Sequence, residues 1–167
     1  MSHEVPEPGT RVGWGFDAHP LDGDPPLILG GVTVSEDIGV TATSDGDVLA
    51  HSVTDALLGA AVMGDIGGLF PSDDPMMEDA SSLFLLRQAA TMVTAAGWSV
   101  RHVDTTVVIE QIRVSPFREP IRSGLAEALG ISPELVSVKA TTTDGLGFIG
   151  RGEGLAAVAV ITLGPLA

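Results

Sequence analysis

One aspartate and two histidines have the residue types and the spacing of metal ligands. Asp17 and His19 are separated by one residue within the stretch GFDAH, residues 15–19. On a β-strand, residues i and i+2 point to the same side, so both side chains can face one ion. With His51 they supply two imidazoles and one carboxylate, and three protein ligands with an open fourth position are typical of catalytic zinc. The alternative is that the two histidines never meet.

His51 lies in a stretch that predicts the central helix of the fold. Residues 44–67 begin with SDGD, which favours a helix N-terminus, and continue with an apolar face at the helical period. Asp47, His51 and Asp55 form a second, polar stripe at positions i, i+4 and i+8. The simpler interpretation of that stripe is an ordinary surface pair of Asp47 and His51, and the functional interpretation is a metal ligand on the polar face.

A second polar group precedes a glycine-rich segment. Residues 141–144, TTTD, follow an apolar strand and are followed by five glycines within residues 145–154. Hydroxyls and exposed backbone N–H groups can bind phosphate oxygens, and Asp144 can hold a hard cation such as Mg²⁺. Glycines alone are weak support, because most glycine-rich loops are only turns. Ser44 at the start of the central helix adds another anion position, and Asp65 could bind ribose hydroxyls.

The composition limits the classes of function. The 167 residues carry a net charge of −14, which argues against binding to a nucleic-acid backbone. An acidic protein that handles a phosphorylated ligand needs local positive charge, and a metal ion supplies it. The chain contains no cysteine, which excludes disulfides and thiolate metal sites. Because 44% of the residues are hydrophobic, we expect apolar surface that is covered in a homo-oligomer.

Nothing in the sequence indicates a membrane span or an export signal. The longest uncharged run covers residues 154–167, which is too short to cross a bilayer. The N-terminus has no basic region followed by an apolar stretch. We therefore expect a cytoplasmic protein with a flexible tail over residues 1–10 and one domain over residues 11–167.

Hydrophobic periodicity predicts helices and strands without strict alternation. The expected strands cover residues 11–16, 27–29, 32–34, 98–111, 135–142 and 155–163, and the expected helices cover the central stretch, residues 81–96 and residues 115–129. Long loops are expected over residues 64–79 and 143–154. This order predicts an α+β fold with one mixed β-sheet and helices packed on one face, in a single domain.

Six stretches together resemble the 2-C-methyl-D-erythritol 2,4-cyclodiphosphate synthase family over residues 11–163. They are GFDAH (15–19), SDGDV (44–48), TDALLGAA (54–61), GDIG (64–67), KATTT (139–143) and LGFIGRGEG (146–154). Several motifs in one order at the family's spacing are highly specific. The resemblance implies a homotrimer with each active site at a subunit boundary. It also implies a step in the non-mevalonate (MEP) route to isoprenoid precursors.

The resemblance assigns expected roles to individual positions. Asp17, His19 and His51 correspond to the family's zinc ligands, and Asp144 to the carboxylate that binds a second cation, Mg²⁺ or Mn²⁺, on the substrate diphosphate. Catalytic roles are expected for Ser44, Thr142 and Asp144. The positions expected to contact substrate or another small ligand are Asp17, His19, Thr43, Ser44, Asp65, Gly67, Ala140, Thr141, Thr142, Phe148 and Arg151.

Seven of these positions are expected to fall into three groups. Asp65 and Gly67 correspond to residues that hold the cytidine ribose. Residues 140–142 correspond to the neighbouring subunit's contacts to the cytosine and the diphosphate. Phe148 and Arg151 correspond to the mouth of a cavity on the threefold axis, which can hold an isoprenoid diphosphate.

The implied reaction is an intramolecular phosphoryl transfer by a phosphorus–oxygen lyase. In 4-diphosphocytidyl-2-C-methyl-D-erythritol 2-phosphate, the 2-phosphate attacks the β-phosphorus and expels CMP. The phosphate nucleophile is already ionised at neutral pH, so the protein's tasks are positioning and charge neutralisation. Two alternatives stay open: a trimer that has lost turnover and binds isoprenoid diphosphates, and a zinc-dependent phosphohydrolase that yields a linear product.

Four positions depart from the family pattern. Thr43 stands where the family usually has a phosphate-contacting histidine, and Ser72 stands where aspartate is frequent. Residues 112–113, Ile-Arg, replace a common Pro-Lys near the cytidine pocket, which keeps the charge but changes its geometry. Residues 144–145, Asp-Gly, replace Glu-Lys. None of these changes removes an expected zinc ligand, so we expect an active enzyme.

Overall fold

The computed structural model describes residues 9–71 and 80–166. Ser72 and most of the tail predicted over residues 1–10 lie outside the described residues. The strands are β1 (Arg11–Pro20), β2 (Leu27–Leu29), β3 (Val32–Ser35), β4 (Trp98–Val108), β5 (Val136–Thr141) and β6 (Gly154–Pro165). The helices are α1 (Val48–Ala61), α2 (Ile66–Leu69), α3 (Ser82–Ala95), α4 (Arg118–Leu129) and α5 (Gly147–Gly150), with short 3-10 turns η2 (Ser115–Phe117) and η3 (Pro133–Leu135).

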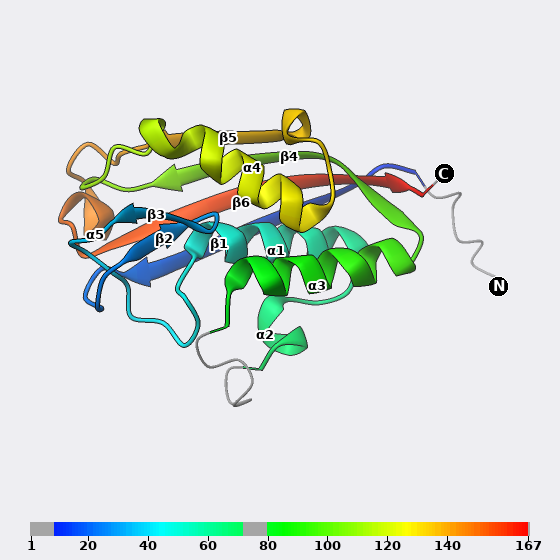
Figure 1. Cartoon of the computed structure of the whole chain (residues 1–167), viewed down its shortest axis with the longest axis horizontal. Coiled ribbons are helices and arrows are strands. Elements are labelled where there is room, and N and C mark those ends of the chain that lie inside the picture. Colours follow the sequence, from blue (N-terminus) through cyan, green and yellow to red (C-terminus); the bar gives the residue numbers. More distant parts are fainter. Residues whose placement is uncertain (1–8, 72–79, 167) are drawn as a thin grey trace.

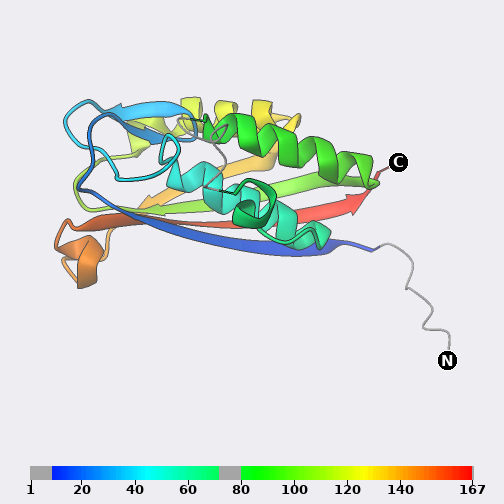
Figure 2. The ribbon, with the colours of Figure 1, turned by 90° about the horizontal axis from the view of Figure 1, so that it is seen from below.

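Four strands form a mixed sheet in the order β1-β6-β4-β5 (Figure 1). Strand β6 is antiparallel to β1 and β4, whereas β4 and β5 run parallel. Strands β2 and β3 form a separate hairpin, as their glycine turn predicted. Seen along the sheet in Figure 2, α1, α3 and α4 lie on one side of it. The predicted α+β fold with a mixed sheet and helices on one face is confirmed.

Strand β1 and the glycine-rich segment differ from their predicted bounds. Strand β1 continues through Pro20 instead of ending at Phe16, because Asp17 and His19 pair with residues of β6. The expected loop over residues 143–154 contains the short helix α5, and the expected loop after α1 contains α2. The extension of β1 matters for function, since it places Asp17 and His19 on regular strand backbone.

Helix α1 packs on β1 and β6 and carries much of the core. It begins at Val48, and its N-cap is Asp47, the last residue of the SDGD stretch expected at the helix N-terminus. Asp47 is fully buried, and its carboxylate accepts hydrogen bonds from the backbone N–H groups of Gly30 (2.9 Å), Gly31 (2.7 Å) and Ala50 (3.0 Å). Asp47 thereby attaches the β2–β3 turn to the start of α1. Its interpretation as one half of a surface pair is therefore wrong.

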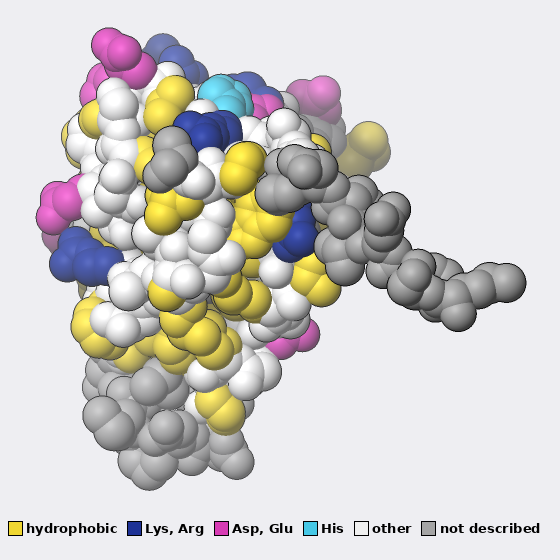
Figure 3. Space-filling view, turned by 90° about the vertical axis from the view of Figure 1, so that its right-hand side faces the viewer, with side chains coloured by type: hydrophobic (Ala, Val, Ile, Leu, Met, Phe, Trp, Pro, Cys, Tyr) yellow, Lys and Arg dark blue, Asp and Glu magenta, His cyan; other side chains and the backbone are white. Residues whose placement is uncertain are grey.

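The uncovered face of β1 is apolar. Val12, Trp14 and Phe16 are 65%, 63% and 48% exposed, and the rings of Trp14 and Phe16 are stacked with centroids 6.1 Å apart. Hydrophobic side chains also reach the surface in several places at the end of the molecule shown in Figure 3. Aromatic side chains of this size are usually covered in a folded protein. In the described parts of the chain, no helix is long and apolar enough to span a membrane.

Candidate active site

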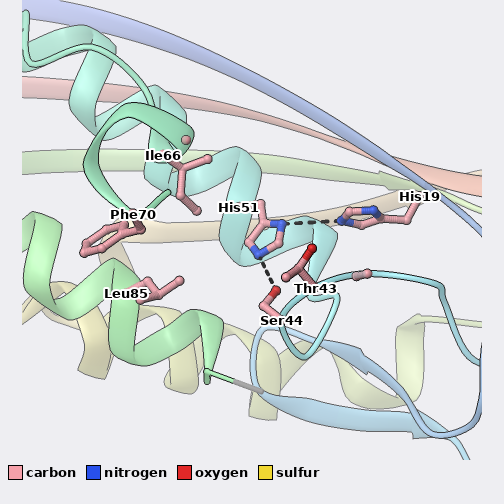
Figure 4. Close-up of a pocket in the computed structure, with 9 residues that line it drawn as sticks. His19, Thr43, Ser44, His51, Ile66, Phe70 and Leu85 are labelled. Atoms are coloured by element: carbon pink, nitrogen blue, oxygen red, sulfur yellow. Dashed lines mark hydrogen bonds between the residues drawn. The ribbon is translucent and has the colours of Figure 1, made fainter. Parts of the chain in front are cut away.

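The three predicted metal ligands meet between the end of β1 and helix α1. Asp17 Oδ2 lies 3.1 Å from His19 Nε2 and 3.0 Å from His51 Nδ1. The two imidazole nitrogens are 3.4 Å apart (Figure 4). The side chains are 25%, 18% and 13% exposed respectively. Two imidazole nitrogens and a carboxylate oxygen that converge in this way suit a divalent transition metal. The alternative that the histidines never meet is wrong.

This cluster is the only group of three or more potential His or carboxylate ligands among the described residues. Its ligand atoms all lie within 4.8 Å of one another. Asp144, the residue expected at a second cation, belongs to no such group in the described part of the chain. A cation at Asp144 would therefore need further oxygen ligands, such as water or a bound phosphate.

The charges of the cluster are strongly coupled. Burial acts to raise the pKa of Asp17, but the hydrogen bonds and charges of His19 and His51 hold that pKa well below its usual range. Burial acts to lower the pKa of His51, but the hydrogen bond and charge of Asp17, with more distant carboxylates, raise it. Without a metal, protons supply the positive charge that the carboxylate requires. A metal ion would replace them.

Affinity for a divalent metal ion is expected to fall as the pH drops through the raised pKa of His51. A proton on Nδ1 competes with the metal for one lone pair, so the affinity should change about tenfold per pH unit below that pKa if one proton is displaced. Calorimetric titration of the metal-free protein in buffers of different ionisation enthalpy measures the released protons. An affinity that is constant across this range would contradict proton competition.

The stability of the metal-free protein should follow the same two pKa shifts. Asp17, with its lowered pKa, stabilises the fold above its ordinary value of 3.8, and this contribution is lost as the pH falls through the folded value. His51, with its raised pKa, stabilises the fold below 6.5, and this contribution is lost as the pH rises through the folded value. Both contributions are present between these two values, which thermal melts in the presence of a chelator can test.

A pocket opens beside the metal ligands (Figure 4). Its lining consists of His19, Ala42, Thr43, Ser44, His51, Ile66, Gly67, Phe70 and Leu85. The predicted residues Thr43, Ser44 and Gly67 thus share one pocket with two metal ligands. Its volume of about 230 Å³ is below the 300–1,000 Å³ typical of sites that bury a drug-sized ligand. A nucleotide-linked substrate would therefore extend beyond it.

A second pocket lies at the end of β4 and β5. Its lining consists of Ile109, Ile112, Arg113, Val114, Ser115, Arg118, Ala140, Thr141 and Thr142. The three predicted residues 140–142 lie here, together with Arg113, one of the positions that depart from the family pattern. The two pockets share no lining residue. A single chain therefore contains two separate groups of predicted substrate contacts.

Glu110 holds the turn that carries Thr142 and Asp144. Its Oε1 accepts hydrogen bonds from Thr143 N at 2.7 Å, Thr143 Oγ1 at 3.1 Å and Gly145 N at 3.3 Å. These donors hold the pKa of Glu110 below its usual range. Thr142 Oγ1 donates to Asp144 Oδ1 at 3.2 Å. Sequence reasoning missed Glu110, because its role depends on a contact 33 residues away along the chain.

The remaining predicted residues line neither pocket. Asp65 is the N-cap of α2 and accepts a hydrogen bond from Gly68 N at 2.8 Å. Phe148, in α5, is 44% exposed. Arg151 follows α5 and pairs with Glu153 through two hydrogen bonds of 2.8 and 3.0 Å. Asp65 lies directly before two lining residues of the first pocket, Ile66 and Gly67, whereas Phe148 and Arg151 line neither pocket.

Comparison with known proteins identifies the family. The model of the YgbB family matches residues 10–164. The chain belongs to this family. It is 48% identical over 153 residues to 2-C-methyl-D-erythritol 2,4-cyclodiphosphate synthase of Moorella thermoacetica, covering 92% of this chain and 94% of the relative. The predicted membership in the cyclodiphosphate synthase family is confirmed.

Two solved structures show the same fold. The bifunctional IspDF of Campylobacter jejuni superposes with a TM-score of 0.93 at 41% identity, covering 96% of this chain but 44% of that protein. The chain therefore spans less than half of the bifunctional enzyme. The CDP complex of Plasmodium falciparum IspF superposes with a TM-score of 0.83 at 33% identity, covering 96% of this chain and 99% of that one.

Proposed function

We propose that this enzyme converts 4-diphosphocytidyl-2-C-methyl-D-erythritol 2-phosphate to 2-C-methyl-D-erythritol 2,4-cyclodiphosphate with release of CMP, in the MEP route to isoprenoid precursors. The observation that carries the proposal is the convergence of Asp17, His19 and His51 beside a pocket, in a chain of this family. The relative from Moorella thermoacetica is named for this product, and the relative from Plasmodium falciparum was solved with CDP.

The chemistry needs placement of two phosphates and neutralisation of their charge. An oxygen of the 2-phosphate forms a bond to the β-phosphorus, the bond from that phosphorus to the bridging oxygen breaks, and the electron pair leaves with CMP. A zinc ion bound by Asp17, His19 and His51 would polarise phosphate oxygens. Ser44 lines the same pocket and offers a hydroxyl to the substrate. No general base is required, because the attacking phosphate is already ionised.

We further propose that the working enzyme is a homotrimer with active sites at subunit boundaries. The metal pocket and the pocket at residues 140–142 are separate in one chain, so a neighbouring subunit could supply the second half. The apolar face of β1, formed by Val12, Trp14 and Phe16, offers a surface for that neighbour.

Light scattering is expected to give a mass about three times the 17.1 kDa of one chain. Trp14→Glu should dissociate the trimer, because it places a charge in the apolar face of β1. Phe84→Glu is the matched control: Phe84 is 52% exposed on α3, so its replacement should leave the mass unchanged. A stable monomer of the native protein at micromolar concentration would count decisively against the trimer.

Three further expectations stay predictions. Asp144 would bind Mg²⁺ or Mn²⁺ together with the substrate diphosphate, with Thr142 beside it. Phe148 and Arg151 would contact an isoprenoid diphosphate at the mouth of a threefold cavity. The third is the cytoplasmic location expected from the sequence.

A CMP-release assay with mass analysis of the product, with and without divalent metal, tests the proposed function. Metal-dependent CMP release with a cyclic product and no solvent oxygen is the expected result. A linear product that contains ¹⁸O from labelled water would identify a phosphohydrolase instead. Binding of isoprenoid diphosphates without CMP release would favour the trimer that has lost turnover.

Thr43→His is expected to raise turnover about tenfold, equivalent to roughly 1.4 kcal/mol of barrier. Thr43 is exposed and lines the metal pocket beside Ser44. A histidine there could donate a charge-assisted hydrogen bond to a phosphate, worth roughly 1.5–3 kcal/mol. The measurement is kcat at saturating substrate, together with zinc content.

Thr41→His is the matched control for this change. Thr41 is also exposed but does not line the metal pocket, so turnover should not change. Unchanged or lower turnover in Thr43→His, with zinc content intact, would show that the site has adapted around threonine.

A further inference from the structure

The Nε2 atom of His51, which faces away from Asp17 and His19, contacts residues outside the metal cluster. Its Nε2 lies 2.8 Å from Ser82 Oγ, at the first residue of α3, and 3.2 Å from Ser44 Oγ. Ser82 is 1% exposed, so water does not compete for its hydroxyl. The imidazole is therefore fixed at both nitrogens, by Asp17 and His19 at Nδ1 and by hydroxyls at Nε2.

The hydroxyl of Ser82 is itself oriented by Asp45. Asp45 Oδ1 accepts a hydrogen bond from Ser82 Oγ, and Asp45 Oδ2 accepts one from Ser82 N at 2.9 Å. A carboxylate only accepts hydrogen bonds, and a serine hydroxyl has one proton to donate. That proton therefore lies between Ser82 and Asp45. Ser82 Oγ can then only accept from His51, so Nε2 must carry a hydrogen.

We propose that Asp45 and Ser82 are positioning residues for His51, which hold the hydrogen on Nε2 and direct the Nδ1 lone pair to the metal. The inference rests on the metal site of the proposed function and extends it to two residues outside the ligand set. Mutation of a residue that orients a ligating histidine in this way typically weakens metal binding by 10- to 100-fold. The two residues also connect α3 to the site, since Leu85, one turn after Ser82, lines the metal pocket.

The zinc affinities of Ser82→Ala, Asp45→Asn and the double variant test whether Asp45 acts on His51 through Ser82. Ser82→Ala removes the nearer of the two hydroxyl acceptors of Nε2 and leaves Ser44 Oγ at 3.2 Å. Asp45→Asn can turn the Ser82 proton toward Nε2, where it opposes the Nε2 hydrogen. Each single variant should bind zinc 10- to 100-fold more weakly in competition with a chromophoric chelator. Because Asp45 acts through Ser82, the double variant should be no weaker than Ser82→Ala alone.

Two controls separate this role from a general effect on folding. Ser52→Ala removes a buried hydroxyl on α1, which donates its hydrogen bond to Leu49 O and not to His51. Asp37→Asn removes an exposed carboxylate that belongs to no group of metal ligands among the described residues. Both should bind zinc as tightly as the native protein, and circular dichroism melts of all variants report whether they fold.

Hydrogen exchange at Nε2 gives a second readout that needs no assay of activity. In the zinc-loaded native protein, the Nε2–H signal in proton–nitrogen NMR spectra should exchange slowly with solvent, and in Ser82→Ala it should exchange faster. Equal exchange rates in the two proteins, unchanged zinc affinity in both single variants, or additive losses in the double variant would overturn the proposal. Failure to release CMP, with these zinc results intact, would instead overturn the proposed function.

Discussion

His51→Ala is expected to abolish stable zinc binding and, with it, CMP release. The change removes one of three converging ligands and leaves Asp17 Oδ2 and His19 Nε2, which are 3.1 Å apart. Loss of a direct ligand should weaken zinc binding more than loss of a residue that only hydrogen-bonds to a ligand, which costs up to roughly 100-fold. Elemental analysis after dialysis should therefore find little zinc in the variant and about one zinc per chain in the native protein.

His102→Ala is the matched control for this prediction. His102 is exposed on β4 and belongs to no group of metal ligands among the described residues. Its removal should change neither zinc content nor CMP release. Full zinc occupancy in His51→Ala would contradict a metal site formed by Asp17, His19 and His51, whatever the activity of that variant.

The metal ligands could be predicted because short-range geometry determines most of the site. Asp17 and His19 share a side of β1 by the period of a strand, and β1 extends far enough to include both. His51 lies on the face of α1 that turns toward them. The glycines of β1 bring that helix close, so the ligand atoms come within a few ångströms of each other.

The positions of Ser82, Asp45 and Glu110 could not be predicted in the same way. Each acts through a contact more than 30 residues away along the chain, between hydroxyls, carboxylates and backbone N–H groups. Hydrophobic periodicity describes which face is buried but not which polar group meets another. Asp47 illustrates the error that results, because the pattern of a polar stripe gave no sign of the β2–β3 turn that its carboxylate binds.

Gly15→Ala is expected to destabilise the protein by about 3 kcal/mol, at the upper end of the usual cost of overpacking. A Cβ at this position would overlap Ser52 O and lie 2.8 Å from Ala56 N, both backbone atoms of α1 that no rotamer change can move. Helix α1 would have to shift away from β1. The shift would carry His51, the residue before Ser52, away from Asp17, so zinc affinity should fall together with stability.

Gly59→Ala is the matched control for Gly15→Ala, because Gly59 lies in helix α1, which packs against Gly15. A Cβ at Gly59 meets no atom within 4 Å, and alanine favours a helix interior over glycine by about 0.5–1 kcal/mol. Urea unfolding should therefore place Gly15→Ala well below the native protein and Gly59→Ala at or above it. Equal stability of the two variants would mean that the approach of α1 to β1 is looser than these contacts require. The metal cluster would then depend less on that approach than we infer.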